Sequence, residues 1–191
     1  MASSKAPGLV TAEHRQLPMT DKTKPAAFLL IKTNSNAIKI ANSIEQYSPV
    51  AWASVVYGPY QIVAYVEGND ERTLSTFIEN VRSRRDVAEL DARICKSIPE
   101  DERLKTSKME KPNSAVLLIN VDYKEEKERT TTNNLRRLKG VRLTRAMWGP
   151  TDIIAVVEAS DPEAMRNLIC DEVKSMKGVR TNTTLYCYPE L

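Results

Sequence analysis

The sequence has 191 residues, of which 41% are hydrophobic and 28% are charged, and its formal net charge is +3. This composition is ordinary for a soluble globular protein, and so mild a charge does not by itself argue for nucleic-acid binding. The longest apolar runs are far shorter than the roughly 20 residues that a membrane helix needs, and the N-terminus shows no secretory signal. These features predict a cytoplasmic protein that does not span a membrane.

The first residues, 1–26, are polar and have no apolar periodicity, which predicts a tail. A patterned region follows, in which short apolar runs predict strands and helical spacing predicts two helices. The expected strands cover 27–33, 49–57, 61–67 and about 87–96. We expect one helix over 36–47, capped by Ser35, and a second helix that begins at Asn69 or Asp70.

Residues 97–113 are charged and contain proline at both ends, which predicts a linker. The region 114–191 then repeats the same order of elements. The expected strands are 115–121, 140–148, 152–158 and 179–188, and the expected helices are about 124–138 and 161–176. The first of these helices has few apolar residues before Leu135, so we expect its outer half to fray or to contact a partner.

Two stretches of the chain have nearly the same sequence. Residues 57–71 read YGPYQIVAYVEGNDE, residues 148–162 read WGPTDIIAVVEASDP, and seven of the fifteen aligned positions are identical. Unrelated stretches of average composition would share roughly one position. The chain therefore contains an internal duplication, and each copy has the β-α-β-β-α-β order of a ferredoxin-like unit.

The central strands are apolar on both faces, since every side chain in 62–66 and 153–157 is apolar or tyrosine. Helices cover only one face of such a sheet, and the other face needs a second cover. We therefore predict an α+β fold in which the antiparallel sheets of two ferredoxin-like repeats, 27–96 and 114–191, stack within the chain or between two chains. Glu89, Asp91 and Arg93 share one face of the last strand of the first repeat, and this face is expected to be partly wet.

Catalytic chemistry has little support in the sequence. The only histidine is His14, in the tail, which counts against haem-binding barrels and sirohaem decarboxylases of similar fold. The three cysteines, Cys95, Cys170 and Cys187, lack the spacing of a zinc site or a disulfide framework. We expect no enzyme, no cofactor and no metal. The basic run 82–85 is interpreted as cations that suit the end of a helix. The run 136–145 is interpreted as a solvated rim, with a contact to phosphate or to an acidic protein surface as the alternative.

The second copy resembles the C-terminal effector-binding domain (RAM domain) of the Lrp/AsnC transcription regulators. The resemblance rests on Gly149, Asp152, the run 157–159, Asp161 and the GV pair 178–179. The first copy matches less well, because Gln61 replaces the aspartate and Asp86–Val87 replaces the GV pair. The resemblance implies a dimeric α/β barrel that assembles into larger oligomers. It also implies no sequence-specific DNA binding, because the helix-turn-helix is missing.

In such regulators, amino acids or other small effectors bind near the hairpins, and the resemblance carries this role to eight positions. These positions are Tyr57, Gly58, Tyr60, Gln61, Trp148, Gly149, Thr151 and Asp152. A carboxylate at a hairpin could hold an α-amino group. Alternatively, the Gly-Pro pairs only make the turns and Asp152 caps its turn locally.

Two functions follow as hypotheses. In the first, the protein is a non-enzymatic Lrp/AsnC-like regulatory module that binds an amino-acid-like effector or mediates oligomerisation. In the second, it is a scaffold that kept the barrel and docks onto a larger protein complex. Both hypotheses predict a protein partner or self-association.

Overall fold

The computed structural model describes residues 24–96, 113–122 and 125–188. The expected tail up to residue 23, which includes His14, and the expected linker up to residue 112 lie outside the described residues. Within the described ranges, no helix is long and apolar enough to cross a membrane.

The first half, residues 24–96, contains the expected elements in the expected order. These are β1 (Ala26–Thr33), α1 (Ala37–Glu45), β2 (Val50–Tyr57), β3 (Ile62–Glu67), α2 (Glu71–Arg82) and β4 (Val87–Ile94). The predicted cap of the first helix is wrong by one residue. Asn36 is the N-cap instead of Ser35, because its side chain accepts a hydrogen bond from the backbone nitrogen of Lys39 at 3.0 Å.

The second half, residues 113–188, repeats this order with one irregularity. Its elements are β5 (Asn113–Val121), α3 (Glu125–Arg137), β6 (Val141–Ala146), β7 (Ile153–Ala159), α4 (Pro162–Asn167), the π-helical segment η2 (Leu168–Val173) and β8 (Val179–Cys187). The single helix expected over 161–176 is therefore α4 continued by a wider π-helical turn, in which Lys174 N donates to Ile169 O.

Helix α3 is the element with the weakest helical pattern in the sequence. Leu135 is fully buried against the sheet, and Thr131 and Thr132 are buried beside it. The hydroxyl of Thr132 donates to the carbonyl oxygen of Glu128 at 2.8 Å, so this threonine needs no external partner. The helix thus uses threonines where an amphipathic helix normally has larger apolar residues.

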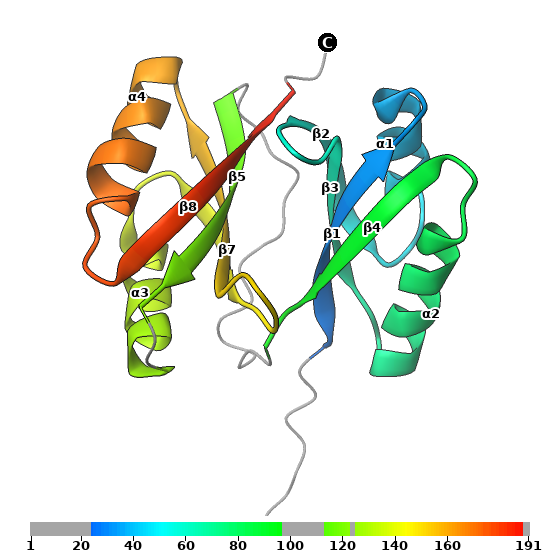
Figure 1. Cartoon of the computed structure of the whole chain (residues 1–191), viewed down its shortest axis with the longest axis horizontal. Coiled ribbons are helices and arrows are strands. Elements are labelled where there is room, and N and C mark those ends of the chain that lie inside the picture. Colours follow the sequence, from blue (N-terminus) through cyan, green and yellow to red (C-terminus); the bar gives the residue numbers. More distant parts are fainter. Residues whose placement is uncertain (1–23, 97–112, 123–124, 189–191) are drawn as a thin grey trace, which may run out of the picture.

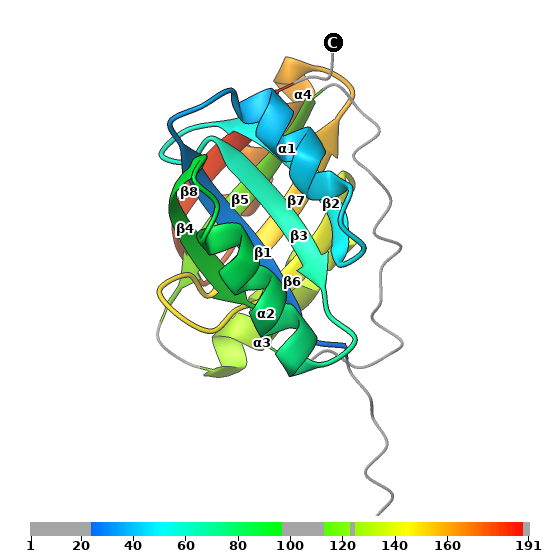
Figure 2. The same cartoon turned by 90° about the vertical axis from the view of Figure 1, so that its right-hand side faces the viewer.

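The strands form one continuous eight-stranded antiparallel sheet in the order β4-β1-β3-β2-β8-β5-β7-β6, rather than the two separate sheets expected from the sequence. The halves join because β2 pairs with β8 through Val56 and Cys187. At the other seam, Cys95 forms an isolated bridge with Met147. The helices lie on the outside, α1 and α2 over one part of the sheet and α3 and α4 over the other (Figures 1 and 2).

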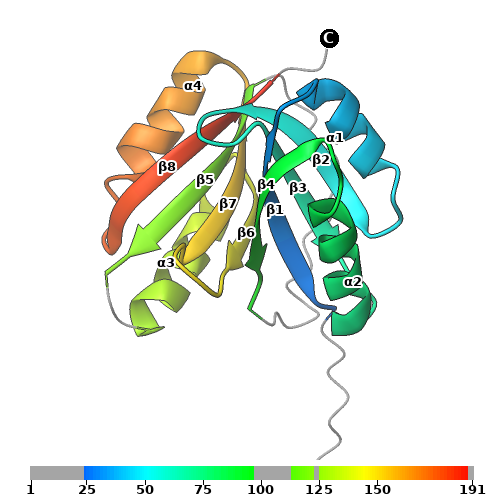
Figure 3. The same ribbon diagram turned by 45° about the vertical axis from the view of Figure 1, so that its right-hand side comes forward.

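The sheet encloses one apolar cluster to which both halves contribute, and Figure 3 shows the facing strands on either side of it. Phe28 and Tyr65 of the first half and Val116 and Leu185 of the second half are buried in this shared cluster. Two further clusters lie between the helices and the sheet, one in each half. The expected α+β class is confirmed, and the shared cluster explains why the central strands are apolar on both faces.

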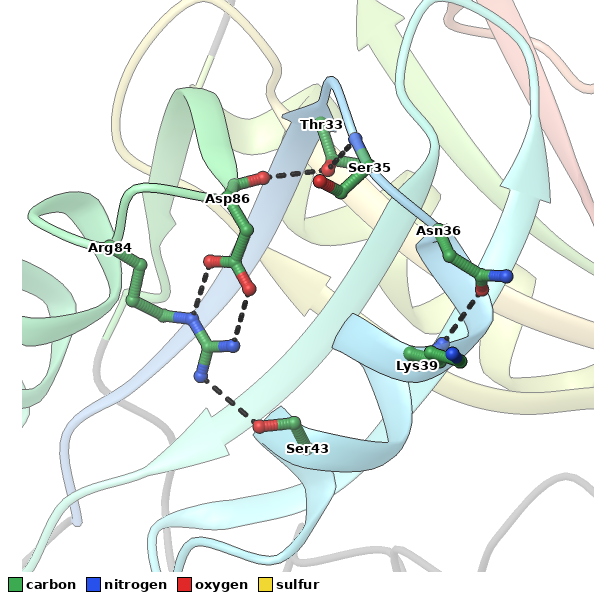
Figure 4. A network of polar contacts seen from close by, with 7 residues as sticks. All are labelled: Thr33, Ser35, Asn36, Lys39, Ser43, Arg84 and Asp86. Atoms are coloured by element: carbon green, nitrogen blue, oxygen red, sulfur yellow. Dashed lines mark hydrogen bonds and ion pairs between the residues drawn. The ribbon is translucent and has the colours of Figure 1, made fainter.

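A polar network fastens the start of β4 to the first helix (Figure 4). Arg84 donates from Nε and Nη2 to the two carboxylate oxygens of Asp86, at 2.9 and 2.8 Å, and from Nη1 to Ser43 on α1 at 3.3 Å. The hydroxyl of Thr33, at the end of β1, donates to the carbonyl oxygen of Asp86 at 2.6 Å. The basic run 82–85 therefore includes a structural arginine as well as solvated ones.

An Asp86→Asn variant is expected to be less stable than the wild type at neutral pH by about 0.5–1 kcal/mol, because a partly exposed ion pair contributes in this range. The hydrogen bonds from Arg84 lower the pKa of the Asp86 carboxyl below its usual value. A depressed folded pKa stabilises the fold above the unfolded pKa, and this contribution is lost as the pH falls through the folded pKa. Urea titrations from neutral pH to about pH 3 should therefore show the two proteins converging in stability.

Candidate functional site

The two hairpins expected to bind a ligand lie apart in the fold, the β2–β3 turn at the upper end of Figure 1 and the β6–β7 turn at the lower end. Their aromatic residues point outward: Tyr57 is 58% exposed and Trp148 is 65% exposed. Tyr57 packs on Tyr188 with 5.7 Å between the ring centroids, and the Nζ atom of Lys96 lies 4.9 Å from the centre of the Trp148 ring. These two aromatic residues therefore do not share one pocket.

Gln61 and Asp152 have matching structural roles. Gln61 Oε1 accepts a hydrogen bond from the backbone nitrogen of Thr33 at 3.0 Å, and Asp152 Oδ2 accepts one from the backbone nitrogen of Val121 at 2.8 Å. Each side chain satisfies the backbone at the end of the neighbouring strand. This geometry favours the local capping role that the sequence left open as an alternative.

Tyr60 is the hairpin residue that joins a polar group of side chains, which we name the Arg93 cluster. The cluster consists of Lys32, Tyr60, Glu89, Asp91 and Arg93. The Tyr60 hydroxyl donates to Asp91 Oδ2 at 3.0 Å, and Arg93 Nη2 donates to the same oxygen. Lys32 Nζ forms an ion pair with Glu89 at 2.7 Å and lies 5.8 Å from the centre of the Tyr60 ring.

Arg93 is the most unusual member of the cluster. It is only 9% exposed, and its Nε and Nη1 atoms are buried without a hydrogen-bond partner among the residues that the structure describes. The β6–β7 hairpin lies against it, since a Cβ atom built on Gly149 would lie 3.7 Å from Nη1. A buried donor without a partner costs about 1–3 kcal/mol, and more when the group is charged. Such a group is expected where a ligand or a water completes its bonding.

Burial raises the pKa of the Tyr60 hydroxyl, and the hydrogen bond to Asp91 raises it further. The proton therefore stays on the phenol oxygen at neutral pH, next to a guanidinium group. The phenol therefore acts as a hydrogen-bond donor, and it donates to Asp91.

A second arginine is buried inside the sheet near the β4–β6 seam. Arg145 is 2% exposed, and its Nε donates to the Tyr65 hydroxyl while its Nη1 donates to the carbonyl oxygen of Thr144, both at 3.3 Å. Among the described residues, no carboxylate lies within ion-pair distance of it. Burial is the main cause that raises the pKa of the Tyr65 hydroxyl. Burial also raises the pKa of the nearby Cys95 thiol to about 12.

The opposite seam, where β2 meets β8, is apolar at the matching glycine. There a Cβ atom built on Gly58 would lie 2.8 Å from Leu185, whereas Gly149 faces Arg93. Cys187 is buried at this seam, and burial raises the pKa of its thiol to about 12. Two structurally matching places in the fold thus differ in chemistry. The sequence signal for the charged one is the alternation of Glu89, Asp91 and Arg93, which by itself indicates only a partly wet face.

The sequence matches no known family profile, and no curated protein matches it. Among solved structures, the siroheme decarboxylase NirDL is 10% identical, with a TM-score of 0.58 over 85% of this chain and 70% of that one. A mutant chlorite dismutase from Candidatus Nitrospira defluvii is 16% identical, with a TM-score of 0.57 over 90% and 93% of the two chains. The transcriptional regulator NMB0573 from Neisseria meningitidis, in complex with L-Met, is 18% identical, with a TM-score of 0.38 over 63% and 69%.

These comparisons correct two expectations. The interpretations as a non-enzymatic Lrp/AsnC-like regulatory module and as a scaffold are wrong, because the likeness that extends over most of the chain is to siroheme decarboxylase and chlorite dismutase. The expectation that the protein is not an enzyme is overturned by the same likeness to enzyme folds. The motif-based resemblance considered one unit at a time, whereas the whole-chain likeness depends on the sheet that both halves form together.

A haem group does not fit the interior of this sheet. Side chains of the shared cluster, among them Phe28, Trp52 and Tyr65, fill the space between the facing strands. No histidine occurs in the described residues. The buried thiols of Cys95 and Cys187 hold their protons, whereas metal ligation requires a thiolate. The chain therefore has the fold of siroheme decarboxylase and chlorite dismutase with an interior that is packed rather than open to haem.

Proposed function

We propose that this protein is an enzyme that binds a small carboxylate-bearing molecule at the Arg93 cluster. The observation that supports this proposal is the pair of buried donors, Nε and Nη1 of Arg93, that have no partner among the described residues. Each of these N–H groups can donate a charge-assisted hydrogen bond to a carboxylate oxygen. Since neither donor has a partner in the described residues, a carboxylate that binds there would replace no protein hydrogen bond.

The other cluster residues have distinct roles in this proposal. Asp91 positions both Arg93 and the Tyr60 hydroxyl, because one of its oxygens accepts from both groups. Tyr60 holds Asp91 in place through its hydroxyl, which stays protonated because its pKa is raised. Gly149 leaves room beside the guanidinium where any larger residue would approach it. Of the hairpin residues singled out from the sequence, Tyr60 and Gly149 are thus part of the proposed site.

The name of one structural neighbour supports a carboxylate substrate, although the likeness itself concerns only the fold. One structural neighbour is a siroheme decarboxylase, and a second structure of that protein is a complex with an iron-uroporphyrin III analogue. A decarboxylase acts on a carboxylate, which is the group that Arg93 is suited to bind. The packed interior argues that the substrate here enters at the cluster and not within the sheet.

The proposal includes a tandem origin of the fold from two βαββαβ units, 27–96 and 114–191, whose strands face each other across the shared cluster. It is supported by matching details in the two halves. The β1–β4 ladder shifts register just before Thr33 pairs with Val87, and the β5–β8 ladder shifts just before Val121 pairs with Val179. After duplication, only one of the two seams needed to keep a binding function, and the other could become apolar.

Calorimetric titration with matched probes tests the proposal. We expect at least one of succinate and benzoate to bind saturably, whereas the corresponding amide or ester does not, because only the carboxylate carries the negative charge that complements the guanidinium. Thermal unfolding should show the same preference, since a ligand at 100 times its Kd stabilises by about 2.7 kcal/mol. Equal responses to a carboxylate and its amide, or none to any probe, would contradict the proposal.

A further inference from the structure

A cavity of about 250 Å³ opens on the outside of the second half, between α3 and the turn before β8. We name it the Lys127 pocket, and it is lined by Lys127, Thr130, Thr131, Lys177 and Gly178. It lies on the helix side of the sheet and shares no residue with the Arg93 cluster. The proposed carboxylate site therefore does not account for it.

The residues that line the pocket are two lysines, two threonines and one glycine. Thr131 is only 1% exposed. The nearest acidic partner recorded for Lys127 is Asp122, at 3.1 Å from Nζ in an exposed ion pair of the kind worth at most about 1 kcal/mol. Within the described part of the chain, no carboxylate lines the pocket itself. A pocket with donors and cationic groups but no lining carboxylate is suited to an anion.

The first half shows how the same position is filled from within the chain. Val87 and Val179 have matching places in their ladders, so Asp86 and Gly178, which precede them, correspond. The Asp86 carboxylate is held there by Arg84 (Figure 4). Gly178 has no side chain, and its φ of +101° disfavours any other residue. A Cβ atom built on it would lie 3.1 Å from the Thr131 hydroxyl oxygen, so the space next to this hydroxyl stays open.

We infer that the Lys127 pocket binds the phosphate group of a small molecule, which takes the place that the internal carboxylate occupies in the first half. Two lysines and two threonines line the space, and their ammonium and hydroxyl groups can together donate several hydrogen bonds to a tetrahedral dianion. The cavity is larger than one phosphate ion and slightly below the roughly 300 Å³ at which drug-sized ligand pockets begin. A short phosphorylated metabolite is therefore the expected ligand class.

Thermal shift and calorimetric titration with inorganic phosphate, glycerol 3-phosphate and adenosine monophosphate test this inference. At least one probe should raise the unfolding temperature beyond chloride at equal ionic strength. A Lys127→Met/Lys177→Met variant should bind it at least about tenfold more weakly, because two charge-assisted contacts are lost. Thr131→Val should bind about fivefold more weakly, because only one neutral hydroxyl is removed.

The matched control is Lys174→Met, which removes an exposed lysine outside the pocket and should leave the affinity unchanged. Binding of inorganic phosphate alone would identify an ion site and overturn the assignment to an organic phosphate, whereas preference for an organic phosphate would support it. An absence of any effect beyond chloride would overturn the whole inference. Equal affinity in the wild type and the double lysine variant would do the same, and loss of binding in Arg93→Leu would then place the phosphate at the Arg93 cluster.

Discussion

An Arg93→Leu variant is expected to gain about 1–2 kcal/mol in its free energy of unfolding and to lose carboxylate binding by at least about 100-fold. The gain arises because two buried donors without partners are removed. Leucine is compatible with the position, since Leu185 occupies the matching place at the other seam, against Gly58. In this variant Asp91 loses its hydrogen bond from Arg93 but keeps the one from the Tyr60 hydroxyl, so leaving Asp91 with one partner fewer costs less than the gain.

Opposite changes in stability and binding are the signature of a residue kept for its function. Urea unfolding measures the first and calorimetry with the best carboxylate probe measures the second. Arg93→Lys is the matched control, because it keeps the charge but not the planar fork, and we expect it to retain only weak binding. A variant Arg93→Leu that is clearly destabilised, or that binds as well as the wild type, would show that the guanidinium is structural.

Phe28→Ala is expected to destabilise the protein by about 3–5 kcal/mol, because it removes a fully buried aromatic side chain. The Phe28 ring lies in the shared cluster, with its centroid 4.9 Å from that of Tyr65 and 6.1 Å from that of Trp52. The second half supplies the other side of this cluster. The loss should therefore weaken both halves together, and unfolding should remain one cooperative transition.

Denaturant unfolding followed in parallel by far-ultraviolet circular dichroism and tryptophan fluorescence checks this expectation. Trp52 is buried in the shared cluster, so its part of the fluorescence reports on that region, whereas Trp148 is exposed and reports on the β6–β7 hairpin. Ile38→Ala is the control, since Ile38 is exposed on α1 and its removal should change stability by less than about 0.5 kcal/mol. Two separate transitions in Phe28→Ala would mean that the halves are stable independently, contrary to the role given to the shared cluster.

Local sequence determined most of the secondary structure. Alternating runs, glycine turns and caps act over a few residues, so the elements of both halves appear where the pattern predicts them. Asp70 and Asp161 cap α2 and α4 through their side chains, as expected from their positions ahead of apolar helices. Helix α3 was the weak case, because its buried face contains Thr131 and Thr132, whose polarity hides them from a hydrophobic pattern.

The closed arrangement of the sheet was not available from local pattern. Apolar character on both faces of the central strands required a second cover, but it did not say that β2 would pair with β8 or that Cys95 would bridge to Met147. Such pairings join residues far apart in the chain, and their register depends on how both halves pack. The strand pattern therefore predicts stacked sheets where the structure has one continuous sheet.

The sequence by itself determined that this protein is built from two similar βαββαβ stretches with apolar strands, because that information lies in short-range periodicity and in the repeated string. The tertiary structure alone decided which polar residues form the proposed binding site. In the sequence, Arg93 is one more charged residue on an alternating strand. In the structure, β4 places it against the β6–β7 hairpin, where it is buried. Burial and the lack of a partner are properties of three-dimensional packing, and they turn a surface-like residue into the centre of a proposed site.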